Sequence, residues 1–502
     1  MKKLNKRIKT YSDISTALSA FSDKQLSDLL DKAEHLYAGI GGKAVLLDIE
    51  KTKIFVKKIP LTDLERQPEN IRFTANLFGL PLSYHIGVGS AGFSSWRELF
   101  IHEMTTNWVI SGECQNFPIL YHWRMLPTTN QKPMNADELE KLERDVEYWD
   151  NSPAVRTRLE AIHNSSAHVY LFLEYIPQTL DKWLGSKLIE GGEVTTNALD
   201  FVDIKLKETS KFMNTQGLIH FDAHFDNILA DDDTIYFSDF GLALSSQFEM
   251  SNEEIGLFDT YLTYDQCSTV TNFLHSIIAS LLGKDRWNIT LQKVNNDEMS
   301  DFEPAINKII KLYAPIALVM ADFYQNMQQV SKSTLYPAVQ LANLIAEIDK
   351  SIETEFKIFP ATDKESEYII NKIIDFNNKQ IAFTQAAEPI YLNYVVKNHT
   401  GIIAGINAYM YHWGLLFVDV LFVEENYRVN NFGSKLLQMV EDKAKIMGAT
   451  IVHLDTFDFQ AKDFYLKQGY TIFGVLDDCP DGHKSYSLFK KLQKAELNLD
   501  IL

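Results

Sequence analysis

The pattern of apolar and polar residues first predicts a region that forms a helix and then a sheet. Apolar residues recur at roughly helical spacing over residues 11–36, which predicts a helical segment there. Alternating or continuous apolar runs at 44–49 and 53–59 predict two neighbouring strands. Further strands are predicted at 117–122 and 169–174, separated by a long charged insertion. The first third of the chain therefore reads as a sheet preceded by a helical segment.

The pattern becomes mainly helical in the middle of the chain. The charged insertion at 135–162 has helical character, and amphipathic periodicity predicts helices over 204–214, 268–282 and 301–328. A helix over 94–111, with Ser94 or Ser95 as its N-cap, is predicted within the sheet region. Sheet and helices are thus largely segregated, which is typical of an α+β fold.

A second change of pattern occurs near residue 352. The remaining segments alternate between helix and strand, which predicts a separate α/β domain over residues 352–495. Its expected strands are 355–359, 390–396, 402–411, 415–423 and 450–455, and its expected helices are 364–378 and one that ends near 448.

Length and composition agree with more than one folded domain. A chain of 502 residues is too long for one ordinary core, and 46% hydrophobic with 23% charged residues is typical of a globular protein. The formal net charge of −19 argues against a nucleic-acid-binding surface and favours cationic or neutral partners.

The few cysteines and the N-terminal sequence indicate the cellular compartment in which the protein is expected to act. Cys114, Cys267 and Cys479 lie far apart and are odd in number, so they predict no disulfide framework and favour a reducing compartment. Residues 1–7 are basic but precede no apolar run, and no apolar stretch is long enough to cross a bilayer. We expect a cytoplasmic protein without a membrane partner, although a secreted effector is also compatible.

The most informative stretch for chemistry lies at residues 217–241. It contains the pattern His220-x-Asp222-x-x-x-x-Asn227, followed by Asp239-Phe240-Gly241. Short apolar runs at 227–229 and 235–237 predict a hairpin that leads into the Phe-Gly turn. Phosphoryl transfer needs one carboxylate to orient an acceptor hydroxyl, and an amide and a carboxylate to hold magnesium on the nucleotide phosphates.

A transition-metal site is an alternative interpretation of the same residues. His220, Asp222, His224 and Asp226 alternate, so on a strand they would share one face. A metal site does not predict the amide of Asn227 or the Phe-Gly turn, so we favour phosphoryl transfer.

The two motifs resemble the catalytic and magnesium loops of the protein-kinase-like superfamily. The resemblance implies a phosphotransferase domain over residues 1–350, with a small lobe at about 36–177 and a large lobe at about 178–350. It also implies ATP and Mg²⁺ as cofactors. Asp222 would orient the acceptor hydroxyl, and Asn227 and Asp239 would hold the metal.

The resemblance extends to the expected nucleotide contacts. Lys57, on the strand at 53–59, would contact the nucleotide phosphates, and the turn containing Gly39, Gly41 and Gly42 would bring backbone N–H groups close to them. A second glycine-rich sequence at 87–92 matches the usual spacing more literally but follows Lys57, and we favour a loop leading into the next helix over an unusual phosphate clamp.

Two further elements would complete the nucleotide site. The helix at 94–111 would present a glutamate to Lys57, and the sequence leaves Glu98 and Glu103 as alternatives. The segment 171–177 resembles the hinge between kinase lobes, so the backbone at Glu174 and Ile176 would meet the adenine edge.

The phosphate acceptor is left open. No Ala-Pro-Glu sequence follows the Phe-Gly turn, whereas His224 resembles a feature of small-molecule phosphotransferases such as aminoglycoside and choline kinases. Both a protein Ser/Thr hydroxyl and a cationic small molecule are compatible acceptors.

The C-terminal region resembles the GNAT acetyltransferases. The resemblance rests on Arg-x-x-x-x-Gly-Ser from Arg428 to Ser434, on Phe464-Tyr465 and on Gly469-Tyr470. It implies that the amides at a helix start bind the pyrophosphate of coenzyme A. The implied acetyl-CoA contacts are Val423, Arg428, Asn431, Gly433 and Ser434.

The family usually has glycine where this chain has Val429 and Asn431. Asn tolerates a left-handed backbone better than most residues, whereas Val is stiff. By resemblance, Tyr465 would protonate the departing thiolate, with a core aromatic as the alternative role. Asp419 would serve as base for the acceptor amine, or is simply an exposed strand carboxylate.

Together these observations predict a two-lobed protein-kinase-like domain followed by a GNAT domain with a mixed central sheet. The expected function is that of a bifunctional transferase, using ATP for transfer to a hydroxyl and acetyl-CoA for transfer to an amine. The alternative is that one domain is a catalytically weak nucleotide- or CoA-binding module that regulates the other.

Overall fold

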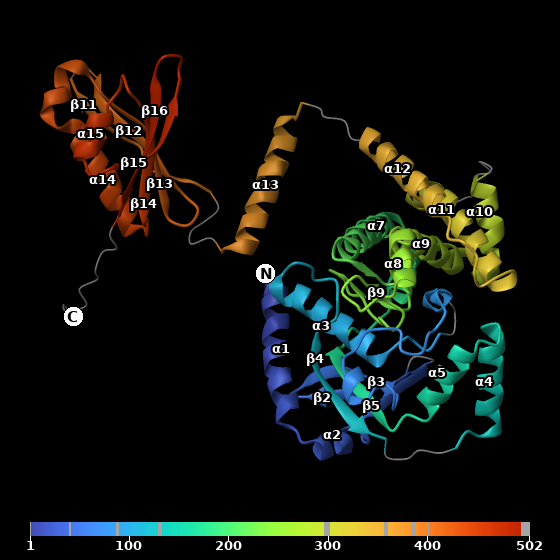
Figure 1. Cartoon of the computed structure of the whole chain (residues 1–502). Helices are drawn as coiled ribbons and strands as arrows, with labels where there is room; N and C mark the ends of the chain where they lie inside the picture. Colours follow the sequence, from blue (N-terminus) through green and yellow to red (C-terminus); the bar gives the residue numbers. More distant parts are fainter. Residues whose placement is uncertain are drawn as a thin grey trace. The chain divides into compact units, whose positions relative to one another are not determined.

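The computed structural model describes residues 2–39, 42–86, 90–128, 133–295, 302–355, 360–382, 388–399 and 401–492. The chain folds into two compact units, Lys2–Lys357 and Ile358–Leu502 (Figure 1).

The N-terminal unit begins with two helices, α1 (Lys2–Ala20) and α2 (Asp23–Leu30). The helical pattern predicted over 11–36 is therefore confirmed as far as residue 30, but it is divided between two helices and does not extend to residue 36. Ser22 starts a new helix because its side chain accepts a hydrogen bond from the amide of Gln25, whose own side chain caps Ser22 in return. Residues 34–36 belong instead to strand β1 (Glu34–Gly39), where pairing with the next strand outweighs the local helical pattern.

A five-stranded antiparallel sheet follows, in the order β1-β2-β3-β5-β4. The predicted strands at 44–49, 53–59 and 169–174 are confirmed, and the strand predicted at 117–122 lies further along the chain. Phe117 and Ile119 precede that strand as buried core residues, which explains their apolar pattern. The remaining strands are β2 (Gly42–Ile49), β3 (Thr52–Leu61), β4 (Leu120–Pro127) and β5 (Ala167–Glu174).

One long helix and a helical insertion accompany this sheet. Helix α3 (Ser95–Ser111) begins at Ser94, whose side chain accepts a hydrogen bond from the amide of Trp96, and it ends at the left-handed Gly112. The predicted helical insertion is confirmed as α4 (Ala136–Tyr148) and α5 (Pro153–His163). Two short 3₁₀ helices, η1 (Pro68–Asn70) and η2 (Leu82–His85), lie between β3 and α3.

The rest of the N-terminal unit is mainly helical, and Figure 1 shows α7 to α11 grouped apart from the sheet. Short strands β6 to β9 form two small antiparallel pairs between the helices, and β7 and β8 make the predicted hairpin. The elements are α6 (Leu180–Glu190), α7 (Gly192–Thr215), β6 (Leu218–Ile219), β7 (Ile228–Ala230), β8 (Ile235–Phe237), β9 (Leu244–Ser245), α8 (Asn252–Thr260), α9 (Tyr264–Leu282), η3 (Lys284–Arg286), α10 (Trp287–Asn295), α11 (Pro304–Gln329) and α12 (Ala338–Glu355).

Helix α11 corrects one expectation from the sequence. By length and composition it could cross a bilayer, with a mean hydropathy of 1.3 over its most apolar 18-residue window. Ile310, Tyr313 and Met320 of this helix are nevertheless buried in the core of the N-terminal unit. Packing inside the unit therefore accounts for its apolar character.

The C-terminal unit contains a mixed seven-stranded sheet in the order β10-β12-β13-β14-β16-β15, with β11 also paired to β12. Only β13 and β14 are described as a parallel pair. The strands are β10 (Ile390–Tyr391), β11 (Tyr394–Asn398), β12 (Gly401–Tyr411), β13 (Leu415–Val423), β14 (Ile451–Phe457), β15 (Thr471–Asp477) and β16 (Lys484–Lys491). The helices are α13 (Asp363–Gln380), η4 (Glu425–Asn430), α14 (Phe432–Ile446) and α15 (Lys462–Lys467).

One predicted strand of this region is not present as expected. The strand expected at 355–359 would begin at Glu355, but that residue ends helix α12, and residues 356–359 lie outside the described part of the chain. The remaining order, a helix followed by strands, a long helix and a further strand, agrees with the pattern-based prediction.

Helix α14 packs its apolar side against one face of the mixed sheet. Leu436, Leu437 and Val440 are buried in the same cluster as Ile406 and Val418 of the sheet. This spacing of apolar residues is that of an amphipathic helix on a sheet. The packing fixes where the start of α14 lies relative to the end of β13.

Candidate functional sites

The loop after β6 positions Asp222. Phe221 has a left-handed backbone conformation, with φ of 64°. The amides of His220 and Phe221 donate to the two carboxylate oxygens of Asp265 on α9, at 2.7 and 3.0 Å. Left-handed residues other than glycine are costly and are commonly held by their surroundings at functional sites. Asp265, which the sequence analysis did not identify, therefore fixes the loop that presents Asp222.

Asn227 and the β7–β8 hairpin hold the second half of this site. The side-chain nitrogen Nδ2 of Asn227 donates to the backbone oxygen of Asp222 at 3.0 Å and to the carboxylate of Asp222 at 2.9 Å. The backbone oxygen of Asn227 accepts bonds from the amide and hydroxyl of Ser238, at 3.0 and 2.7 Å. These contacts bring Asp222 and Asn227 together beside the turn that carries Asp239.

The alternation that suggested a transition-metal site is not realised on a strand. His220, Asp222, His224 and Asp226 lie in a loop, so they do not share one strand face. His220 is fully buried, with its Nε2 at 3.0 Å from the backbone oxygen of Ser238. Among the described residues no group of three His, Cys, Asp or Glu side chains could hold a metal ion.

Lys57 joins the sheet to the turn after the hairpin. Its ammonium nitrogen lies 2.6 Å from Oε1 of Glu98 on α3 and 2.6 Å from Oδ1 of Asp239. Burial alone would lower the pKa of Lys57, but the carboxylates of Asp239 and Glu98 outweigh that effect and raise the pKa above its ordinary value. Lys57 is therefore a charged ammonium held between two carboxylates.

The structure distinguishes the two candidate glutamates of α3 by their contacts. Glu98 is buried and contacts Lys57, whereas Glu103 pairs with the guanidinium of Arg72 at the surface. The five-residue separation turns the two side chains to different sides of the helix. Glu103 is thus placed away from Lys57.

Asp222 and Asp239 carry carboxylates with opposite pKa shifts. Burial raises the pKa of Asp222 to about 6, with the negative charge of Asp239 adding to the effect and His224 opposing it. Burial also acts to raise the pKa of Asp239, but the ammonium of Lys57 outweighs it and lowers the pKa. Neighbouring carboxylates that differ in this way are typical of sites that move protons near neutral pH.

The glycine-rich turn is only partly described. Gly39 and Gly42 face each other where β1 and β2 join, and Gly41 lies outside the described residues. Gly87, Val88 and Gly89 of the second glycine-rich sequence also lie outside them. Residues 90–92 at the end of that sequence are described, and the amide of the next residue, Phe93, donates to the backbone oxygen of Gly241 at 3.3 Å, beside the Asp239 turn.

The predicted hinge has an additional contact that the sequence did not reveal. The carboxylate of Glu174 is held by Arg7 of α1, whose Nε and Nη2 donate to it at 2.6 to 3.1 Å. Arg7 also donates to the backbone oxygens of Gln115 and Phe117, at 2.9 and 2.6 Å. The side chain of Glu174 is therefore structural, and only its backbone and that of Ile176 remain candidates for adenine contacts.

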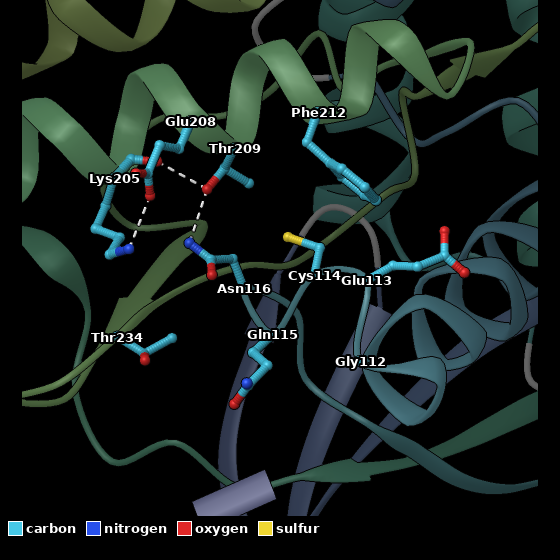
Figure 2. A pocket seen from close by; sticks show the side chains of 10 residues that line it. All are labelled: Gly112, Glu113, Cys114, Gln115, Asn116, Lys205, Glu208, Thr209, Phe212 and Thr234. Atoms are coloured by element: carbon cyan, nitrogen blue, oxygen red, sulfur yellow. Dashed lines mark hydrogen bonds and ion pairs between the residues drawn. The ribbon is translucent and has the colours of Figure 1, made fainter. Parts of the chain in front are cut away.

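A pocket with a volume of about 380 Å³ lies between the loop after α3 and helix α7 (Figure 2). It contains none of the site residues predicted from the sequence. Its lining residues are Gly112, Glu113, Cys114, Gln115, Asn116, Lys205, Glu208, Thr209, Phe212 and Thr234. The side chain of Asn116 donates a hydrogen bond to Thr209, and its backbone oxygen accepts one from the amide of Phe237. The pocket therefore borders the β7–β8 hairpin.

In the C-terminal unit, the start of α14 has the conformation expected of an anion-binding turn. Asn431 is left-handed, with φ of 58° and ψ of 19°, so it adopts the backbone for which glycine is otherwise favoured. Within the described part of the chain no side chain caps this 15-residue helix. The free amides and the helix dipole at such a start attract anions.

Other predicted CoA contacts lie around the same turn. A β-carbon on Gly433 would lie 3.5 Å from the ring of Phe464 and 3.6 Å from Val423, so β13, α14 and α15 meet there. Arg428 donates from Nε to the backbone oxygen of Val423 at 3.2 Å. Ser434 is half-buried in the first turn of α14. The side chain of Val429 lies outside the described part.

Strands β13 and β14 separate next to Asp419. Their parallel pairing runs only from Leu415–Ile451 to Phe417–His453. On the other side of β13, the register with β12 shifts between Asn407 and Ala408, which leaves Asp419 as the extra residue of a bulge. Bulges re-aim side chains and are common beside active sites. Asp419 is exposed at this opening.

Tyr465 lies on α15 within the core of the C-terminal unit. Its ring centroid is 5.1 Å from that of Phe464 and 5.8 Å from that of Tyr470. Burial raises the pKa of the Tyr465 hydroxyl to about 12, so the group is protonated at neutral pH. These contacts fit a core aromatic, and the protonated hydroxyl fits a proton donor.

Comparison with known proteins assigns a family to the chain. The sequence profile of the Acetyltransferase (GNAT) family matches residues 350–470. Blasticidin-S acetyltransferase from Streptomyces morookaense is 31% identical over 104 residues, which cover 20% of this chain and 76% of the relative. An acetyltransferase from Agrobacterium fabrum is 30% identical over 100 residues, which cover 20% of this chain and 73% of the relative.

A solved structure, an acetyltransferase from Bacillus cereus, is 37% identical and covers 28% of this chain and 99% of its own, with a TM-score of 0.26. The two acetyltransferase relatives are at least 30% identical and are covered over more than two thirds of their length, which assigns the chain to their family. The chain belongs to the GNAT acetyltransferase family, with a GNAT fold and a mixed sheet at its C-terminus.

Proposed function

We propose that the chain is a bifunctional transferase. Its C-terminal unit transfers an acetyl group from acetyl-CoA to an amine, and its N-terminal unit transfers the γ-phosphoryl group of ATP to a hydroxyl. The observation that carries the second activity is the position of Lys57 within 2.6 Å of both Glu98 and Asp239. These three residues come from a strand, a helix and a turn that lie far apart in the sequence.

The side chains of the N-terminal site fit the parts that phosphoryl transfer needs. Lys57, oriented by Glu98, would bind the nucleotide phosphates, and Asp239 and the amide oxygen of Asn227 would hold Mg²⁺. When bound, the ion would neutralise phosphate charge. Asp222 would accept the proton of the acceptor hydroxyl as the new O–P bond forms and ADP leaves.

The C-terminal site fits acyl transfer in the same way. The uncapped start of α14, with Asn431 and Gly433, would hold the pyrophosphate of coenzyme A. Asp419, at the opening between β13 and β14, would accept a proton from the acceptor amine. Tyr465 would donate a proton to the thiolate as the C–S bond breaks.

The net charge of the chain limits the chemical classes expected as acetyl and phosphate acceptors. The formal net charge of −19 favours cationic or neutral acceptors and disfavours nucleic acid. The Streptomyces relative is named a blasticidin-S acetyltransferase, and together with the negative charge of the chain this leads us to propose a small cationic amine as the acetyl acceptor. The phosphate acceptor is a protein or a cationic small molecule that carries a hydroxyl, and we place the reactions in the cytoplasm without a membrane partner.

A mass-shift screen tests this function. Candidate amines and alcohols, including cationic sugars and protein mixtures, are incubated with the full chain and either ATP–Mg²⁺ or acetyl-CoA. We expect additions of phosphate and of acetyl, each only with its own donor. Phosphate transfer that persists in Asp222→Ala and Asp239→Ala proteins would contradict the N-terminal assignment. Calorimetry that detects ATP binding without turnover would instead identify that unit as a nucleotide-binding module.

A further inference from the structure

The residue preceding Glu98 has an environment that the proposed chemistry does not use. The side chain of Arg97 is 1% exposed although it carries a full positive charge. Its Nη2 lies 2.7 Å from Oε1 of Glu254, which is also 1% exposed, and its Nε donates to the backbone oxygen of Thr74 at 2.6 Å. Buried ion pairs are costly to desolvate, and Nη1 of Arg97 has no hydrogen-bond partner among the described residues, so the contacts with Glu254 and Thr74 are what hold the guanidinium in place.

The Arg97–Glu254 pair joins two elements that meet at the proposed nucleotide site. Arg97 belongs to α3, and Glu254 lies in the first turn of α8, which follows the Asp239 turn in the chain. The guanidinium also lies over the rings of Phe93 and Phe248, at 5.2 and 5.0 Å from their centroids. The segment that begins at Asp239 is thus tied back to the helix that carries Glu98.

Other contacts reinforce the same connection. The carboxylate of Glu249 accepts bonds from the amide and hydroxyl of Thr74, while the hydroxyl of Thr74 lies 3.0 Å from the amide of Glu249. Nδ1 of His85 lies 2.7 Å from the backbone oxygen of Leu242. The chain before α3 is therefore fastened to the segment after Asp239 at several points.

This arrangement bears on how the Lys57–Glu98 pair is formed. In phosphotransferases of this type, the lysine–glutamate pair and the metal-binding aspartate must be in place together, and helix position commonly controls the pair. Here an unmodified chain already has both contacts to Lys57. Arg97 and Glu98 are adjacent residues of α3, so any rotation of the helix that moves Arg97 also moves Glu98.

We propose that Arg97 is the positioning residue that holds Glu98 against Lys57 through its buried contact with Glu254, so that the N-terminal site is assembled without covalent modification. The proposal rests on the phosphotransfer function proposed above. Arg97 does not contact Lys57, Asp222 or Asp239 in the described contacts, so its effect passes through α3.

The test uses the full chain with Arg97→Met, Glu254→Gln and the control Arg72→Met. Arg72 also pairs with a glutamate of α3, but that pair is exposed and involves Glu103. We expect Arg97→Met to lower phosphotransfer kcat/KM for ATP by about 100-fold, as expected for misplacement of a catalytic group by about 1 Å. Glu254→Gln keeps the side-chain volume and should give a smaller loss, and Arg72→Met should equal the wild type.

Amide hydrogen exchange gives a readout that does not depend on activity. Residues 95–111 should exchange faster in the two test variants than in the wild type and the control, at a temperature where circular dichroism shows all four proteins folded. Phosphatase treatment should leave the wild-type rate unchanged. If Arg97→Met does not fold, Glu254→Gln decides the result.

Two outcomes would overturn the inference: folded test variants with wild-type kinetics and exchange, or a wild-type rate that disappears on phosphatase treatment. A wild-type chain that transfers no phosphate to any acceptor would count against the proposed function instead. In that case the exchange of residues 95–111 would still report whether Arg97 positions the helix.

Discussion

The ammonium of Lys57 lies 2.6 Å from the carboxylate of Glu98, although the two residues are 41 positions apart in the sequence. The sequence could not distinguish Glu98 from Glu103 as the partner. Their surroundings do so, because Glu98 is buried beside Lys57 and Glu103 contacts Arg72.

This difference gives a matched pair of variants. Glu98→Gln should lower phosphotransfer kcat/KM by about 100-fold, because Lys57 loses the carboxylate that orients it. Glu103→Gln should change the rate less than about twofold, since exposed ion pairs contribute little. Steady-state kinetics with varied ATP measure both, and equal losses in the two variants would refute the distinction.

The raised pKa of Asp222 predicts a pH dependence for phosphotransfer. Its pKa is about 6, above the ordinary 3.8, so the carboxylate gains a proton as the pH falls through 6. Only the ionised form can accept the hydroxyl proton, and kcat/KM should therefore fall about tenfold per pH unit below that value. A rate that stays flat down to pH 5, with the protein still folded, would contradict this role.

His224 provides a control for the origin of that pKa. The electrostatic effect of His224 lowers the pKa of Asp222 and so opposes the effect of burial, which raises it. In the plot of phosphotransfer kcat/KM against pH, His224→Gln should therefore move the fall at acidic pH to a higher pH without removing it. A fall that disappears in this variant would show that the titrating group is His224.

Arg7 is expected to be important for the stability of the N-terminal unit. It is 6% exposed and bonds the carboxylate of Glu174 and two backbone oxygens, so Arg7→Met removes the positive charge that pairs with Glu174 and leaves its carboxylate only the amide of Ile119. Breaking such a pair should lower the free energy of unfolding by about 3 kcal/mol. Urea denaturation of the purified chain measures this change.

Lys3 on the same helix supplies the comparison. It pairs with Asp231, and both side chains are about one-third exposed. Lys3→Met should therefore change the free energy of unfolding by less than about 1 kcal/mol. If Arg7→Met behaves like Lys3→Met, Glu174 does not depend on Arg7.

Tyr465→Phe separates the two roles considered for that residue. The ring packs in the core and would be retained, whereas the hydroxyl would be lost. As a proton donor, Tyr465 should contribute about 100-fold to acetyl-transfer kcat while leaving the affinity for CoA unchanged. A variant with the wild-type acetylation rate would identify Tyr465 as a core aromatic only.

The sequence predicted most elements because their apolar patterns are local. The helices over 94–111 and 268–282 and the strands at 44–49, 53–59, 169–174, 402–411 and 415–423 follow from periodicity, whereas β15 and β16 were not predicted. Where tertiary contacts outweigh the local pattern, the prediction was wrong. Residues 34–36 pair in β1 instead of extending a helix, and residue 355 ends α12 instead of starting a strand.

The candidate sites divide in the same way. Asp222, Asn227 and Asp239 could be proposed from the sequence because they lie within one short motif, and Asn431 because the GNAT family usually has glycine at its position. Arg7, Arg97 and Asp265 gave no signal, since each acts on a residue distant in sequence. Only the folded chain shows which carboxylate or amide they contact.

The central claim is that one chain carries two independent transfer sites, and a paired-donor assay tests it most directly. The full chain is supplied with γ-labelled ATP and acetyl-labelled acetyl-CoA in wild-type, Asp239→Ala and Tyr465→Phe forms, with acceptors from the screen. The account predicts that Asp239→Ala loses phosphate transfer and keeps acetyl transfer, and that Tyr465→Phe does the reverse. Phosphate transfer by Asp239→Ala at the wild-type rate, or none by the wild type with any acceptor, would contradict the account.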